Sequence, residues 1–203
     1  MCTSADTPIE PAVATGSPAQ GRLPGDLAMW FFILAELSVF ALLILAFAVT
    51  QQLKPHLFAA SRQRLDTSTG LAMTLSLLSA GLLAALAQER VRRARPRQGA
   101  ALLLAALLVA TVYLALKLGE YRHLLGLGLG LEHNTFFTLY WILTGFHFLH
   151  VLLGMLILAW LALGCRRGRY GAEHRSGLES GVLYWHMVDL VWVLLFPLVY
   201  VLE

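Results

Sequence analysis

The sequence predicts an all-α integral membrane protein, built as a bundle of five transmembrane helices. Only 13% of the 203 residues are charged and 58% are hydrophobic, whereas a soluble domain has roughly 25% charged residues. Uncharged segments long enough to cross a bilayer fill most of the chain, and short polar segments connect them. We therefore expect one membrane domain over residues 27–203. The net charge is only +3, and no basic face with interleaved aromatic residues is visible, so a nucleic-acid partner is not expected.

The expected helices follow from the apolar segments. A membrane-spanning helix needs about 20 mainly apolar residues, and five segments have this length, at approximately 27–50, 69–87, 99–118, 135–164 and 180–202. Small residues at four-residue spacing in the second segment suit close helix contact in lipid: Ser76, Ala80 and Ala84. Pro197 is expected to kink the last turn of the fifth segment, because proline has no backbone N–H.

Residues 1–26 contain four prolines and several Ser, Thr and Gly residues, and we expect them to form a disordered cytoplasmic tail. Positively charged residues favour the cytoplasmic side of a membrane. With the N-terminus inside, ten Lys or Arg residues lie in inside segments and five in outside segments, which predicts an N-in, C-out orientation. Both cysteines, Cys2 and Cys165, then face the cytoplasm, where thiols stay reduced.

Five ionisable residues lie well inside the predicted spans: Glu36, His147, His150, His186 and Asp189. Such groups cost at least ~2.5 to 3.5 kcal/mol each at the bilayer centre, so each suggests a function. Two interpretations of Glu36 stay open. In the first, its carboxyl group has a function, as a proton-binding group or one that senses lipid headgroups. In the second, it only forms a hydrogen bond between helices.

The histidines occur in two pairs with helical spacing. His147 and His150 are three residues apart in one span, and His186 and Asp189 are three apart in the next, so each pair shares a helix face. Facing pairs would form an intramembrane polar network. The alternative is metal or haem ligation by the three histidines, since imidazole is a common transition-metal ligand. Lys117 and Glu120 predict an interfacial ion pair, with Lys117 extending toward water.

Three segments carry a family resemblance: LAMWFFILAELSVF, NTFFTLYWILTGFHFLHVLLG and LESGVLYWHMVDLVWVLLFPLVYVL. Together they resemble the cytochrome c oxidase subunit III family of the haem-copper oxidases. KLGEY also looks like a Q/K-x-x-E-Y segment of that family. The resemblance begins near Leu27 and implies a five-helix form that lacks the family's first two helices. The last segment, Lys117 and the short loops look more like the nitric oxide reductase-associated (NorE-type) form than the quinol oxidase form.

This resemblance implies an accessory subunit without cofactors of its own, in a bacterial inner membrane, beside a catalytic subunit that holds haem and metal. The expected partner is a nitric oxide reductase, with a quinol or cytochrome c oxidase as the alternative. Bound phospholipid is expected. In the family, however, the first two helices form one wall of the lipid cleft, and the five-helix form lacks them. By position, Glu36 matches the family's buried acid.

Two other functions stay open. The chain could be a self-contained redox enzyme that uses His147, His150 and His186 as ligands, or a proton-coupled carrier that uses Glu36. Against a carrier, the sequence has no visible internal repeat of the kind common in secondary transporters.

Overall fold

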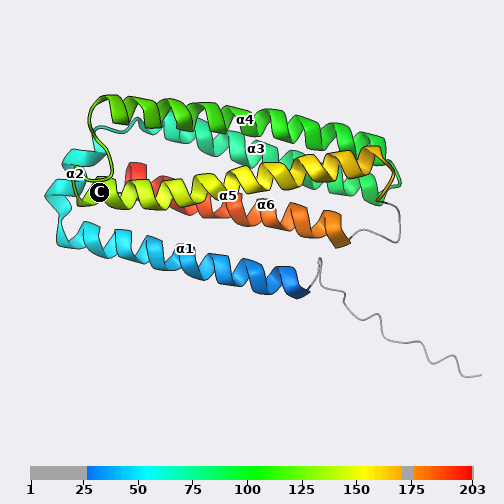
Figure 1. Cartoon of the computed structure of the whole chain (residues 1–203), viewed down its shortest axis with the longest axis horizontal. Helices are drawn as coiled ribbons and strands as arrows, with labels where there is room; N and C mark the ends of the chain where they lie inside the picture. The colour runs from blue at the N-terminus through cyan, green and yellow to red at the C-terminus, as the bar shows by residue number, and fades with distance from the viewer. Residues whose placement is uncertain (1–26, 171–175, 203) are drawn as a thin grey trace, which may run out of the picture.

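Helices make up almost all of the described structure, and five of them are long and apolar enough to cross a membrane. The computed structural model describes residues 27–170 and 176–202; the predicted tail at residues 1–26 lies outside this part. The spans are α1 (Leu27–Leu53), α3 (Thr67–Arg92), α4 (Pro96–Gly126), α5 (Thr135–Arg166) and α6 (Ser176–Phe196), as Figure 1 shows. No strand occurs among these residues. The five predicted spans are confirmed, and several are longer than expected.

The first residues of the spans explain part of this extra length. Asp66 caps α3 by accepting hydrogen bonds from the backbone amides of Ser68 and Thr69. Asn134 caps α5 through the amide of Phe137, and α4 begins at Pro96, where a missing N–H is tolerated. The hydrogen bonds from the Thr69 hydroxyl and from the Ser68 amide lower the pKa of the Asp66 carboxyl group, because they favour its charged form.

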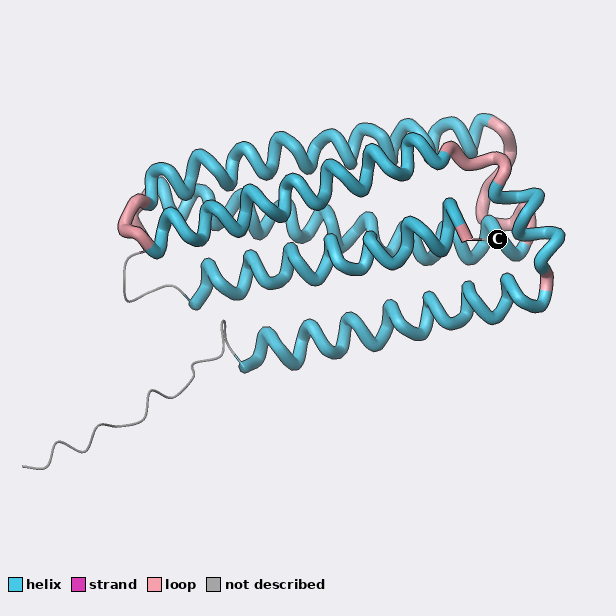
Figure 2. The backbone as a smooth tube through the Cα atoms, turned by 180° about the vertical axis from the view of Figure 1, so that it is seen from behind, coloured by secondary structure: helices cyan, strands magenta, loops and turns pink. Residues whose placement is uncertain are grey.

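A short helix, α2 (Pro55–Arg62), connects α1 to α3 and was not predicted. It begins at a proline and buries Phe58, whose ring packs edge to face against Phe47 and Phe136. Arg62 donates from Nε to the carbonyl of Val199 at 3.1 Å. The tube in Figure 2 shows α2 beside the C-terminal end of the chain.

The final turn, η1 (Pro197–Val201), is π-helical. Pro197 has no backbone N–H to donate, so the regular α-helical ladder does not continue through this turn. Several of its carbonyl groups accept hydrogen bonds from other helices, including those from Arg62 of α2 and Thr67 of α3. The expected disturbance at Pro197 is therefore a change of helix type, stabilised by neighbouring side chains.

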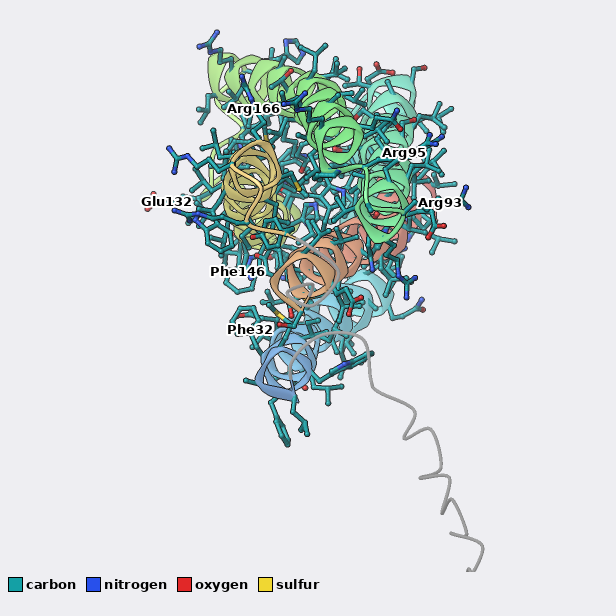
Figure 3. The ribbon with its side chains drawn as sticks, turned by 90° about the vertical axis from the view of Figure 1, so that its right-hand side faces the viewer. Phe32, Arg93, Arg95, Glu132, Phe146 and Arg166 are labelled. Carbon is teal, nitrogen blue, oxygen red and sulfur yellow. The ribbon has the colours of Figure 1, made fainter. Side chains whose placement is uncertain are left out.

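Four spans, α3 to α6, form the core bundle, and α1 lies outside it. Seen along the bundle axis, α1 lies at one edge of the molecule (Figure 3), where it packs against α5 and α6. Along one face, α1 buries four residues: Ile33, Phe40, Phe47 and Gln51. Its remaining surface is largely exposed, so α1 is held through a single stripe of side chains.

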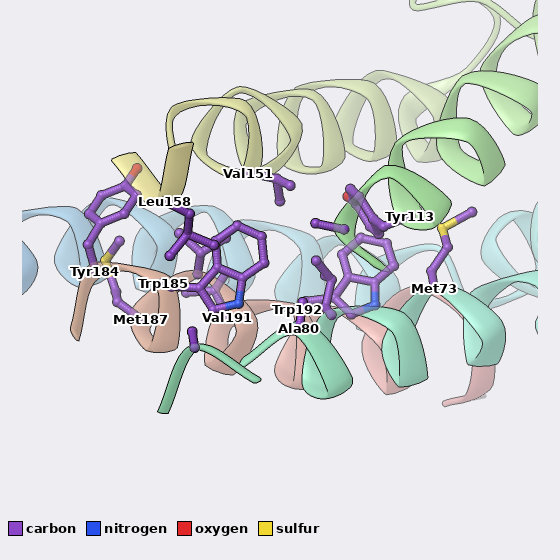
Figure 4. Packing of buried hydrophobic residues seen from close by; sticks show 14 of the residues in the cluster. Met73, Ala80, Tyr113, Val151, Leu158, Tyr184, Trp185, Met187, Val191 and Trp192 are labelled. Carbon is purple, nitrogen blue, oxygen red and sulfur yellow. The ribbon is translucent and has the colours of Figure 1, made fainter. Parts of the chain in front are cut away.

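The core is dominated by large side chains of α6 and small ones of α3. Figure 4 shows Trp185 and Trp192 pointing into the core, with Leu158 beside the first ring and Tyr113 beside the second. The small residues predicted to pack closely, Ser76, Ala80 and Ala84, are all buried. Membrane helices gain little from the hydrophobic effect in lipid, so this close packing is a main source of their association.

Candidate functional site

Glu36 and His150 form a hydrogen-bonded pair that joins α1 to α5. Nε2 of His150 lies 3.0 Å from Oε2 of Glu36, and Nδ1 lies 2.8 Å from the carbonyl of Phe146. A carbonyl only accepts, so Nδ1 carries a proton. An uncharged pair then holds one further proton between Nε2 and Oε2. Both ring nitrogens are satisfied, and the pair can hold or pass on a single proton.

His186 and Asp189 form a second pair, on α6. Nδ1 of His186 lies 3.2 Å from Oδ2 of Asp189. The pair packs against Gly81 of α3, where an added Cβ would collide with Oδ2. The side chain of Asp189 is 10% exposed, whereas that of His186 is 41% exposed. This imidazole therefore lies at the outer surface of the bundle.

The third pair, Lys117 and Glu120, lies inside the bundle. Nζ of Lys117 is 2.7 Å from Oε2 of Glu120 and 3.0 Å from the hydroxyls of Tyr140 and Tyr200. The hydroxyl of Tyr200 is also 2.8 Å from Oε1 of Glu120. Nζ lies over the rings of four aromatic residues as well: Tyr121, Tyr140, Trp192 and Tyr200.

The expectation that Lys117 extends toward water was wrong, because its side chain is 0% exposed. Three hydrogen bonds and the faces of aromatic rings replace hydration of the ammonium group. The residues that surround it come from α4 itself and from α5, α6 and η1. The ion pair itself is present, but it is buried in the bundle.

His147 differs from the other ionisable residues. It is fully buried, and neither ring nitrogen has a hydrogen-bond partner in the described part of the chain. The imidazole packs against the rings of Trp192, Tyr113 and Phe40, with centroid distances of 5.0, 6.1 and 6.2 Å.

The residues of the predicted polar network are therefore not one hydrogen-bonded cluster. His150 is joined to Glu36, His186 is joined to Asp189, and His147 packs among aromatic rings. Within residues 27–170 and 176–202, no group of three or more His, Cys, Asp or Glu side chains is placed to hold a metal ion. Cys165 is a buried free cysteine, and Cys2 lies outside the described residues.

The tyrosines of this region were missing from the sequence-based candidates. Tyr140 and Tyr200 bond to Lys117, and the hydroxyl of Tyr184 donates to the carbonyl of His150. Each lies within an apolar span, where a hydroxyl group needs a partner. That requirement was the available signal, although it does not identify the partner.

This fold defines a multi-span membrane protein, and in its described part six ionisable side chains inside the spans form three pairs. The sequence model of one family, described as cytochrome c oxidase subunit III, matches residues 23–203. The chain belongs to the cytochrome c oxidase subunit III family.

Several relatives are named as oxidase subunits. Cytochrome c oxidase subunit 3 of Thermostichus vulcanus is 40% identical over 41% of this chain and 42% of its own length. Heme-copper oxidase subunit I+III of Aeropyrum pernix is 31% identical over 85% of this chain, but the match covers 22% of that longer protein. The chain thus spans less than half the length of these two relatives. A probable quinol oxidase subunit 3 of Staphylococcus saprophyticus is 24% identical over 90% of both chains.

Proposed function

We propose that this protein is the third subunit of a quinol or cytochrome c oxidase in a bacterial inner membrane. The supporting observation is the family match over residues 23–203, together with a quinol oxidase subunit 3 of similar length. In this function the chain holds no redox cofactor and stabilises a catalytic subunit that binds haem and metal. The Aeropyrum relative, whose name joins subunits I and III, supports such a partner.

Within this function, we assign to Glu36 and His150 a role in holding a proton beside the lipid. The Glu36 side chain is 22% exposed, on a helix whose surface is mostly uncovered. One proton is shared between Nε2 and Oε2 and the pair carries no net charge, so the pair stays neutral when release of this proton is coupled to uptake of another. Bound phospholipid along α1 is part of this proposal.

A nitric oxide reductase is the second candidate for the catalytic partner. It is favoured by Lys117 and by the segment YWHMVDLVWVLLFPLVYVL, which look like the nitric oxide reductase-associated form. The oxidase stands first because the relatives named above are oxidase subunits.

Purification of the tagged chain from gently solubilised membranes tests both candidates. We expect a haem protein to co-purify and to consume oxygen with a quinol or with reduced cytochrome c. The isolated chain should show no haem absorbance. Consumption of nitric oxide in place of oxygen would select the second candidate. A haem band that stays with the isolated chain, or no haem protein at all, would contradict the proposal, and an unrelated tagged membrane protein is the control.

A further inference from the structure

His186 exposes a polar group in the middle of a membrane span. At about 1.5 Å per residue it lies roughly 15 Å from Ser176 and roughly 22 Å from Val201 along the helix axis. Its side chain is 41% exposed, and Nδ1 is bonded to Asp189. Among the described residues, Nε2 has no hydrogen-bond partner. Lipid chains cannot supply one.

The chemistry of the pair indicates what Nε2 requires. Two protons shared over His186 and Asp189 leave the pair uncharged, which is the favoured state inside a membrane. One proton occupies the bond between Nδ1 and Oδ2. The neutral imidazole then carries the other proton on Nε2, because its Nδ1 accepts from the protonated carboxyl group. Nε2 is then a donor that points out of the bundle and needs an oxygen acceptor.

The surface around this donor is apolar and continuous. We define the outer stripe of α6 as Leu183, His186, Leu190 and Leu194, which share one helix face. Leu190 and Leu194 are 53% and 54% exposed. On α3, Leu78 and Leu82 lie near Gly81, which contacts the His186 pair, and they are 44% and 61% exposed. A membrane helix of another subunit fits along this surface if it carries a polar group at the level of His186.

The pair of Glu36 and His150, which joins α1 to α5, has no such unmet hydrogen bond. His150 has both ring nitrogens bonded, to Phe146 and to Glu36. The two histidine pairs therefore differ in whether each ring nitrogen has a hydrogen-bond partner, which is the property that matters for docking. Of these two pairs, only that of His186 leaves a ring nitrogen without a partner among the described residues, and the unpartnered nitrogens of His147 are buried in the core.

We propose that the outer stripe of α6 is the surface on which the catalytic subunit docks. An oxygen atom of one of its membrane helices accepts a hydrogen bond from Nε2 of His186. This inference rests on the proposed function, and the subunit I+III relative supports the choice of occupant because its name joins the two subunits. Polar side chains that bond across membrane helices are a recurrent means of association.

The test uses two exposed leucines as a matched pair. Leu190→Trp adds bulk on the outer stripe, and Leu156→Trp adds it on α5, where Leu156 is 68% exposed. Both sites lie at the outer surface, so both variants should fold. We expect Leu190→Trp to reduce the haem protein recovered per chain by roughly tenfold or more, as overpacking of an interface does. Leu156→Trp should recover the parental amount.

Photo-crosslinking gives a readout that does not depend on affinity. A benzoylphenylalanine in place of Leu190 should form a product with the catalytic subunit, and one in place of Leu156 should not. Products at position 190 with lipid alone, or with a second copy of the chain, would overturn the proposal. Equal recovery of haem protein by the two Trp variants would also overturn it. If the parent chain recovers no haem protein, the proposed function fails first and the docking surface fails with it.

Discussion

Nζ of Lys117 lies 3.0 Å from the hydroxyl of Tyr200, a contact that joins α4 to η1 across 83 positions of the sequence. Tyr200 in turn donates to Glu120, the partner of Lys117 in the buried ion pair. The C-terminal turn is therefore fixed to the middle of the bundle by charge-assisted hydrogen bonds. These are stronger than bonds between neutral groups.

Lys117→Met should destabilise the bundle by ~3 to 5 kcal/mol, because it leaves the buried carboxylate of Glu120 without its cation. Thermal unfolding in detergent measures the effect. The double variant Lys117→Met, Glu120→Gln removes both charges and should recover much of the loss. A double variant that is no more stable than Lys117→Met would contradict the pairing.

Glu36→Gln should leave the fold intact, with a loss of no more than about 1 kcal/mol. The amide group can still form a hydrogen bond with Nε2 of His150, at the place of Oε2. Glu36→Leu is the matched variant that removes this bond, and it should unfold at a lower temperature. The pair would have no structural role if the Leu and Gln variants had the same melting temperature.

Asp189→Leu should destabilise the chain by ~1 to 3 kcal/mol, because Nδ1 of His186 loses its partner and a branched side chain must fit against Gly81. Asp189→Asn keeps a hydrogen-bonding group of the same shape and should lose less. Thermal unfolding of both variants checks this order. Equal stability of the Leu variant and the parent would refute the His186 pairing.

His147→Phe should be as stable as the parent or more stable. The imidazole nitrogens have no partner among the described residues, and the ring already lies among Trp192, Tyr113 and Phe40. Removal of an unsatisfied buried polar group gains ~1 to 3 kcal/mol, less any packing mismatch. Metal content should not change in this variant. A loss of stoichiometric metal would revive the alternative of a redox enzyme.

Acid should weaken the N-terminal cap of α3. The hydrogen bonds from Thr69 and Ser68 hold the pKa of Asp66 below its ordinary value of 3.8. The cap therefore stabilises the folded chain above that value, and this contribution is lost as the pH falls through the lower pKa of the folded state. Asp66→Ala should cost about 1 kcal/mol at neutral pH.

The melting temperature against pH, measured for the parent and for Asp66→Asn, isolates this effect. Asparagine caps the helix without titrating at this position. Its curve should be flatter than that of the parent below about pH 4. Parallel curves would mean that Asp66 makes no contribution to acid sensitivity.

The spans were predictable because each needs only a long apolar run, and the caps Asp66 and Asn134 follow standard local rules. The helix α2 was not predictable in this way. It has only eight residues, and its stability comes from contacts of Phe58 and Arg62 with distant helices.

The candidate residues of the site were visible in the sequence, but their partners were not. Spacing alone placed His147 and His150 on one face. The structure turns one toward the aromatic core and the other toward Glu36, 114 positions away. Likewise, the two tyrosines that hydrogen-bond to Lys117 come from α5 and η1. Such interhelical contacts depend on how the spans pack, which local pattern does not encode.

The single stripe that holds α1 has a consequence for biogenesis. Its helical contacts are with α2, α5 and α6, which are all synthesised after it. Among the described spans, α1 must therefore remain in the bilayer without its main contacts until α5 and then α6 have been inserted. Its composition suits this interval, because it is the most apolar of the five.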